Sequence, residues 1–164
     1  MDNKKDGIGA TLASVVAQDV EPAEVIVVED GSTDGGPDIG RAFGSPLVRL
    51  VVQESAGVSA ARNRGVAGAR GRYVAFLDGD DRWEPGFIGQ VSALIGSYPG
   101  CAIYATGFNT VRGGRKYLAK SPREEGVISD FFREAMYSYV CTASSVVVDK
   151  GTFNAAGGFP EGMK

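Results

Sequence analysis

Three short apolar runs, rich in valine, recur along the first half of the chain at 24–28, 48–52 and 73–77. Each run is almost continuous rather than alternating with polar residues, which is typical of strands buried on both faces, as in a parallel sheet. The segments around them have the composition and length of helices, which we expect at 10–18, 37–43, 59–69 and 85–98. This alternation predicts an α/β fold with an open, mostly parallel sheet flanked by helices.

Local residues support several of these boundaries. Ser59 is placed to cap the helix expected at 59–69, and Gly71 lies just past its end. Pro37 and Pro85 stand at the first turns of two other expected helices, where a missing N–H costs nothing. In the second half we expect, in order, a strand, a basic hairpin or loop, a helix, a strand and a helix, at 101–108, 110–120, 129–136, 143–148 and 150–156.

The composition excludes several kinds of chemistry. The 164 residues fit one domain and contain no histidine, so Ser-His-Asp catalysis, Cys-His catalysis and histidine-ligated zinc are impossible. The formal net charge of −3 argues against a protein that coats nucleic acid phosphates. Cys101 and Cys141 are only two thiols, far apart in sequence and in no C-x-x-C spacing, so a zinc cluster or a disulfide framework is unsupported. We expect two small buried side chains and a reducing compartment.

No apolar run approaches the length of about 18 residues that a membrane-spanning helix needs. The first 19 residues are interrupted by Asp and Gly and do not form a secretory signal core. We therefore expect a cytoplasmic protein, with a peripheral position at the inner face of the membrane as the alternative.

Two acidic segments follow expected strands, at 29–36 and 78–81. Ligands of open α/β sheets bind at the carboxyl ends of the strands, where both segments should lie. Asp78 and Asp80 flank a glycine, and such a concentration of carboxylates suits Mg²⁺ or Mn²⁺ bridging to phosphates. Glu29 and Asp30 could accept hydrogen bonds from a nucleobase or ribose. The alternatives are a solvated acidic turn for the second segment and a helix-capping turn for the first.

Arg62, Asn63 and Arg64 lie on the helix expected between these segments. Arginine is suited to bidentate phosphate binding, but an ion pair with the acidic segments is an equally good interpretation. Trp83 follows the second acidic segment and is predicted to be a packing anchor.

The chain resembles the inverting family 2 glycosyltransferases of the GT-A fold, from about residue 10 to its last residue. The motifs that carry the resemblance are VIVVEDGSTDGG, QESAGVSAARNRGVAGARGRYVAFLDGDDRWEPGFI and TASSVVVDKGTFNAAGGFPEG. The resemblance implies transfer of a sugar from a nucleotide diphosphate sugar, most simply a UDP-sugar, to a glycan, lipid or other hydroxyl acceptor.

The resemblance also implies roles for individual residues. Asp30 would contact the base, with Glu29 replacing a common Asp, and Asp78 would hold the ribose or sugar side of the donor. Asp80 would bind a Mg²⁺ or Mn²⁺ that bridges the diphosphate, and Arg62 would lie near the donor. Asp81 would be structural. The implied donor-site residues are Glu29, Asp30, Gly31, Ser32, Arg62, Asp78, Gly79 and Asp80.

The chain departs from the family pattern at both ends. Family members open with an apolar strand that ends in a Pro and a Tyr-Asn pair, whereas this chain opens with MDNKKDGIG. The family's catalytic base would lie beyond Lys164, and Glu161, the nearest carboxylate, aligns before it. We therefore expect a single domain, 1–164, that lacks its first strand and the base segment.

A missing first strand would leave an exposed sheet edge, which would favour a homodimer. A non-catalytic nucleotide-sugar-binding or assembly fragment is the alternative to an enzyme. A phosphatase using the two aspartates is disfavoured because Asp81 and Arg82 follow Asp80, where those enzymes carry Thr or Val.

Overall fold

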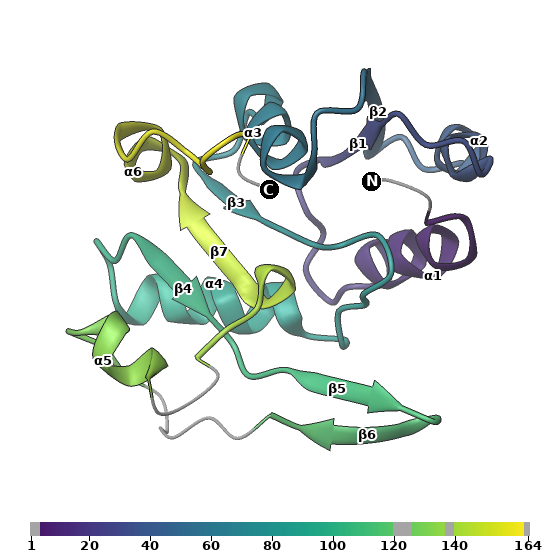
Figure 1. Cartoon of the computed structure of the whole chain (residues 1–164). Coiled ribbons are helices and arrows are strands. Elements are labelled where there is room, and N and C mark those ends of the chain that lie inside the picture. The colour runs from purple at the N-terminus through teal and green to yellow at the C-terminus, as the bar shows by residue number, and fades with distance from the viewer. Residues whose placement is uncertain (1–3, 120–125, 137–139, 163–164) are drawn as a thin grey trace.

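The computed structural model describes residues 4–119, 126–136 and 140–162. Helices and strands alternate through the first half of the chain, which confirms the predicted α/β fold (Figure 1). The helices are α1 (Lys5–Val16), α2 (Gly36–Ala42), α3 (Val58–Gly68), α4 (Phe87–Ser97), α5 (Phe131–Ala135) and α6 (Lys150–Ala155), with a 3-10 turn η1 at Ala143–Ser145. The strands are β1 (Val25–Asp30), β2 (Val48–Gln53), β3 (Tyr73–Ala75), β4 (Ile103–Ala105), β5 (Asn109–Arg112), β6 (Arg115–Leu118) and β7 (Val146–Asp149).

The strands pair in three groups. β1 and β2 are parallel, with a register that runs from Val25 opposite Val48 to Asp30 opposite Gln53. β7 lies between β3 and β4 and is antiparallel to both. β5 and β6 form a separate antiparallel hairpin, which extends away from the other elements in Figure 1. The hairpin predicted at 110–120 is thus present.

Three apolar clusters hold the layers together. The first joins α1 to β1 and β2 through Ile8, Leu12 and Val27. The second joins α4 to β4 and β7, and the third joins α3 and α6 to β3 and β7. Val66 of α3 lies in the third cluster with only 1% of its surface exposed. Both faces of the strands are therefore covered by helices, which explains the continuous apolar runs in the sequence.

Several boundaries differ from the predictions. α1 begins at Lys5 rather than residue 10, and β1 continues to Asp30, so Glu29 and Asp30 belong to the strand rather than the loop. Ser59 does not cap α3, whose N-cap is Gly57 without a side-chain cap. α4 begins at Phe87 with Gly86 as its N-cap, so Pro85 precedes the helix.

The remaining differences lie in short strands and in the cysteines. β3 and β4 are each three residues long, shorter than predicted, and β7 begins only after the turn η1. Cys101 and Cys141 are free thiols that are half-buried, so the expectation of two fully buried side chains is wrong. Within the described ranges, no helix has the length and apolar character that crossing a membrane requires.

Candidate functional site

Asp30 ends β1 with only 3% of its surface exposed. Its carboxylate accepts hydrogen bonds from the backbone N–H groups of Ala56 and Gly57, at 2.8 and 2.9 Å, and from Gln53 Nε2 at 2.8 Å. Burial acts to raise the pKa of Asp30, but the donors Ala56, Gln53 and Gly57 outweigh it, so the pKa lies below its ordinary value. Asp30 is therefore an anion that fixes the loop between β2 and α3.

The residues around Asp30 form a tight turn. The buried Glu29 carboxylate accepts a hydrogen bond from the backbone N–H of Ser32. Gly31 has φ +78°, and a Cβ there would lie 2.9 Å from the Cβ of Ser55. A side chain at Gly31 would thus be strained both by the backbone conformation and by the neighbouring loop.

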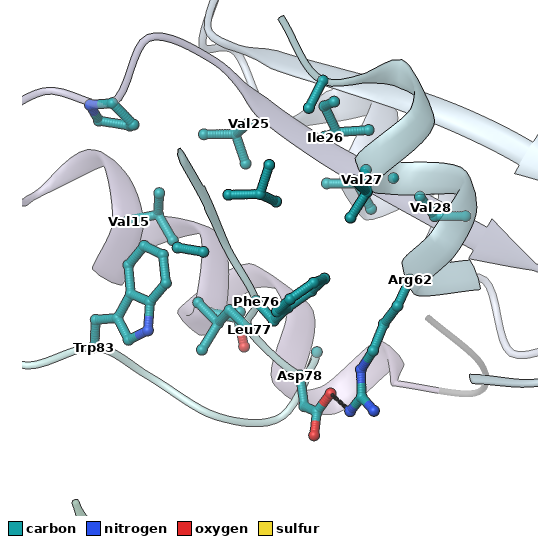
Figure 2. A pocket seen from close by; sticks show the side chains of 18 of the residues that line it. Val15, Val25, Ile26, Val27, Val28, Arg62, Phe76, Leu77, Asp78 and Trp83 are labelled. Atoms are coloured by element: carbon teal, nitrogen blue, oxygen red, sulfur yellow. Dashed lines mark hydrogen bonds and ion pairs between the residues drawn. The ribbon is translucent and has the colours of Figure 1, made fainter. Parts of the chain in front are cut away.

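Asp78 and Arg62 form an ion pair between the loop after β3 and helix α3 (Figure 2). Arg62 Nη2 lies 2.8 Å from Asp78 Oδ1, and the Arg62 guanidinium also lies 5.5 Å from the ring centre of Phe159. The Arg62 side chain is 22% exposed, so it is held in place while part of it still faces solvent. Such a guanidinium can bind an anion without a large loss of rotamer freedom.

Asp80 is paired with the ammonium group of Lys4, whose Nζ lies 2.5 Å from Asp80 Oδ2. The hydrogen bond to Asp80 raises the pKa of Lys4. Helix α1 approaches this loop closely because residue 7 is glycine, where a Cβ would lie 2.8 Å from the Gly79 carbonyl oxygen. Sequence reasoning missed Lys4 as a partner of Asp80, since the two residues are 76 positions apart.

Asp81 and Trp83 anchor the loop after β3 through contacts with Ser144 and Phe87. The Asp81 carboxylate accepts a hydrogen bond from Ser144 Oγ at 2.6 Å, and Trp83 Nε1 donates to the Ser144 carbonyl at 2.8 Å. Trp83 stacks on Phe87 with ring centres 4.3 Å apart, which confirms its prediction as a packing anchor. Ser144 also accepts a hydrogen bond from the backbone N–H of Asp78. Sequence reasoning missed Ser144.

Asn63 is occupied by the C-terminal loop rather than by the acidic residues. Its Nδ2 donates to the Phe159 carbonyl and to Glu161 Oε1, and its Oδ1 accepts from the backbone N–H of Phe159. Arg64, the third polar residue predicted here, is exposed on the surface of α3. Of these three side chains, Arg62 is the one paired with the second acidic segment.

A cavity of about 800 Å³ connects the two acidic segments. Its polar lining at the carboxyl ends of β1 and β3 includes Lys4, Asp30, Arg62, Asp78, Gly79 and Asp80. Glu29 and Ser32 instead line a second hollow of about 400 Å³, beside α2. The structure therefore brings most of the predicted residues to one rim and separates Glu29 and Ser32 from them. No group of three or more Asp, Glu or Cys side chains with metal-binding geometry occurs among the described residues.

Comparisons with known proteins identify the family to which the chain belongs. The sequence model of the family described as Glycosyl transferase family 2 matches residues 2–152. The chain belongs to glycosyl transferase family 2. Relatives include the uncharacterized glycosyltransferase YibD of Escherichia coli K12, 41% identical over 85 residues, and the succinoglycan biosynthesis protein ExoO of Rhizobium meliloti, 40% identical over 84 residues.

These family 2 relatives are considerably longer than the chain. The matches cover 51% of the chain in both cases, but only 25% of YibD and 24% of ExoO. Among solved structures, TarS 1–349 of S. aureus in complex with UDP-GlcNAc has a TM-score of 0.73 at 22% identity, over 98% of this chain and 47% of that one. At this identity the likeness shows the fold, and it confirms the predicted GT-A fold.

Proposed function

We propose that this chain supplies the donor site of an enzyme that transfers a sugar from a nucleotide diphosphate sugar, a UDP-sugar, to an acceptor hydroxyl. The observation that carries the proposal is that Asp30, Arg62, Asp78 and Asp80 line one cavity at the carboxyl ends of β1 and β3. This is the edge at which open α/β sheets bind their ligands. Membership of glycosyl transferase family 2 and the likeness to TarS, solved in complex with UDP-GlcNAc, support the donor class.

The proposed roles follow from what each side chain contacts. Asp30 fixes the loop that begins α3 and presents the carboxylate edge to the base, with Glu29, Gly31 and Ser32 shaping the adjacent turn. Asp78 faces the ribose or sugar. Arg62 would move from Asp78 to a donor phosphate, because a charge-assisted bond to a doubly charged group is stronger than a half-exposed ion pair.

We also propose a divalent cation, Mg²⁺ or Mn²⁺, on Asp80. The ion pair of Asp80 with the Lys4 ammonium supports this proposal, because it places a positive charge on this carboxylate. Asp78 and Asp80 offer oxygen ligands of the kind these ions prefer, and the remaining ligands would come from the diphosphate and water. When bound, the ion would neutralise the diphosphate as it leaves.

The acceptor hydroxyl must lose a proton during direct displacement, which requires a carboxylate base. Glu161 accepts a hydrogen bond from Asn63 at 2.7 Å and is not part of the cavity lining. We therefore do not propose Glu161 as this base.

Titration with UDP in the presence of Mn²⁺ tests the donor site, by calorimetry and by the fluorescence of Trp83, the single tryptophan of the chain. We expect Asp80→Ala to weaken binding about tenfold or more, because one cation ligand is lost. Glu21→Gln, which removes an exposed carboxylate outside the cavity lining, is the matched control and should bind like the wild type.

No UDP binding by a folded sample, or equal affinity of the Asp80→Ala variant, would contradict the donor site. If the 164-residue chain binds UDP but neither transfers nor hydrolyses the sugar of a UDP-sugar, the second function, a nucleotide-sugar-binding fragment, is favoured.

A further inference from the structure

The hairpin β5–β6 stands clear of the rest of the fold. It extends away from the other elements in Figure 1, and every residue of its two strands is exposed. Gly113 and Gly114 close it with φ of +55° and +75°, as in a two-residue type I′ turn, and a Cβ at either position would meet nothing within 4 Å. Because its side chains contribute nothing to the core, their composition reflects contact with solvent or with a partner.

The register of the hairpin assigns its side chains to two faces. Residues directly opposite each other in an antiparallel pair share a face, and the face alternates along each strand. Thr110 lies opposite Tyr117, and Arg112 lies opposite Arg115, so these four residues share one face. The other face carries the remaining four strand residues, which are Asn109, Val111, Lys116 and Leu118.

The two faces have different surroundings. Lys116 turns its own face toward the molecule, because its Nζ lies 2.5 Å from Glu84 Oε1 in the loop before α4. We call the opposite face, made of Thr110, Arg112, Arg115 and Tyr117, the outer face. Among the described residues, neither of its arginines forms an ion pair with a carboxylate. Like charges directly opposite each other destabilise a strand pair, so the outer face carries two uncompensated guanidinium groups.

Positive charge is concentrated in this part of an acidic chain. The formal net charge of the 164 residues is −3, yet no acidic residue occurs between Glu84 and Glu124, and the five charged side chains between them are all basic. Arg112, Arg115 and Lys116 of the hairpin are three of these five. A local excess of one sign attracts groups of the opposite sign within a Debye length of about 10 Å. The charge of the hairpin therefore favours an anionic partner.

The shape of the outer face favours an extended partner over a small anion. Sites for small ligands are concave, whereas the outer face belongs to a projecting ribbon, and no hairpin residue lines either of the two hollows described above. Guanidinium groups bind phosphate in two-pronged fashion. Tyr117, whose surface is 50% exposed, has an apolar ring and a polar tip, a combination favoured at the level of lipid headgroups.

We propose that the outer face of β5–β6 docks on a bilayer that contains anionic phospholipids. Arg112 and Arg115 bind headgroup phosphates, and the ring of Tyr117 lies at the level of the headgroups. Each basic residue near such a surface adds a modest attraction that salt screens, so the contact is reversible and salt-sensitive. The docking is independent of the donor site proposed above, so the failure of one leaves the other standing.

Cosedimentation of the 164-residue chain with vesicles tests the docking. One set of vesicles contains equal amounts of phosphatidylcholine and phosphatidylglycerol, and the other contains phosphatidylcholine alone. The hairpin variant combines Arg112→Gln with Arg115→Gln. The matched control combines Arg64→Gln with Arg133→Gln, which removes the same charge from exposed positions on α3 and α5.

We expect the wild type to bind the anionic vesicles at low salt and to be released at high salt. The hairpin variant should bind them about tenfold or more weakly, and the control should stay within about twofold of the wild type. A second readout uses the fluorescence of an indole introduced by Tyr117→Trp, which anionic vesicles should shift to shorter wavelength. The variant Val111→Trp, on the other face of the hairpin, should show no such shift.

Equal loss of binding in the hairpin variant and the control would overturn the proposal, because only the net charge would then matter. Equal binding of the wild type to both sets of vesicles would also overturn it, as would no binding to either. Soluble polyphosphate and duplex DNA are the alternative anions. Binding to one of these, weakened by the hairpin substitutions and without any binding to vesicles, would assign the outer face to a soluble polyanion instead of a bilayer.

Discussion

At the scale of single residues, the buried carboxylate of Asp30 is expected to affect stability. It is almost fully buried, and three N–H donors hold its pKa below the ordinary value. In the variant Asp30→Asn, the amide NH₂ would face N–H donors and leave one of them unpaired. We expect a loss of about 1–3 kcal/mol in the free energy of unfolding at pH 7, measured by urea denaturation.

The pH dependence of this loss follows from the sign of the pKa shift. Because the folded-state pKa of Asp30 is lower than its unfolded value, its contribution is complete above the unfolded pKa and disappears as the pH falls through the folded one. The difference between wild type and Asp30→Asn should therefore shrink at acidic pH. Asp38→Asn, which changes an exposed carboxylate, is the control, and an equal loss in that variant would contradict the assignment to Asp30.

Lys4 provides a second prediction at this scale, based on its pairing with Asp80. A divalent cation at Asp80 must displace the Lys4 ammonium, which the raised pKa keeps charged. Because a surface ion pair contributes at most about 1 kcal/mol, Lys4→Met should bind Mn²⁺ about two- to fivefold more tightly, measured by electron paramagnetic resonance. Lys116→Met, which removes the partner of Glu84, is the matched control. Unchanged or weaker Mn²⁺ binding by Lys4→Met would exclude competition at Asp80.

At the scale of elements, the position of α1 depends on Gly7. A Cβ at residue 7 would lie 2.8 Å from the Gly79 carbonyl oxygen and 2.9 Å from the Asp80 Cα, both backbone atoms that cannot rotate away. We expect Gly7→Ala to lower the free energy of unfolding by about 1–3 kcal/mol. It should also weaken UDP binding with Mn²⁺, because the loop that carries Asp80 must shift.

Gly9 offers a control on the same helix. A Cβ there would have its nearest atom, from the Ile39 side chain, at 3.7 Å, an ordinary contact. Gly9→Ala should therefore gain helix propensity, up to about 1 kcal/mol, and bind UDP like the wild type. Equal destabilisation of both variants in thermal unfolding would contradict the claim that Gly7 is needed for the close approach of α1 to the acidic loop.

The same helix shows what the sequence could and could not predict. Apolar periodicity located the strands and helices because burial on one or both faces is a local property of each segment. The start of α1 was missed because its two glycines argue locally against a helix, whereas Gly7 is required by a contact with Gly79, 72 positions later. Ser59 was wrongly chosen as a cap because the helix begins at Val58, with Gly57 as its N-cap, and Asp30 from another element fixes the loop before it by accepting from the N–H groups of Ala56 and Gly57.

The residues of the candidate site were also predicted only in part. Motif spacing identified Asp30, Arg62, Asp78 and Asp80, and these line one cavity. Lys4 and Ser144 were missed because their contacts with the acidic loop link residues 76 and 63 positions apart. Glu29 was placed with Asp30 as its neighbour in sequence. Adjacent residues of a strand face opposite sides, and Glu29 lines a different hollow.

At the scale of the whole molecule, β7 connects the parts of the fold. It is the central strand between β3 and β4, and Val147 belongs to the cluster with α4 while Val148 belongs to the cluster with α3 and α6. The hairpin β5–β6, by contrast, is exposed and is not paired with the rest of the fold. All eight of its strand residues are exposed, and its two strands pair only with each other among the described strands.

These differences predict the order in which backbone amides open. Exchange in β7 requires the separation of two apolar clusters and two strand partners, whereas exchange in β5–β6 requires only the opening of an exposed two-stranded ribbon. In native-state hydrogen exchange, we expect the β7 amides to exchange about a hundredfold or more slowly than those of β5 and β6. Val148→Ala should accelerate exchange in β3, β4 and β7 together, since it weakens the strand that joins them. The exposed variant Val111→Ala should leave those three strands unchanged, and similar rates for β7 and the hairpin would mean that β7 does not hold the fold together.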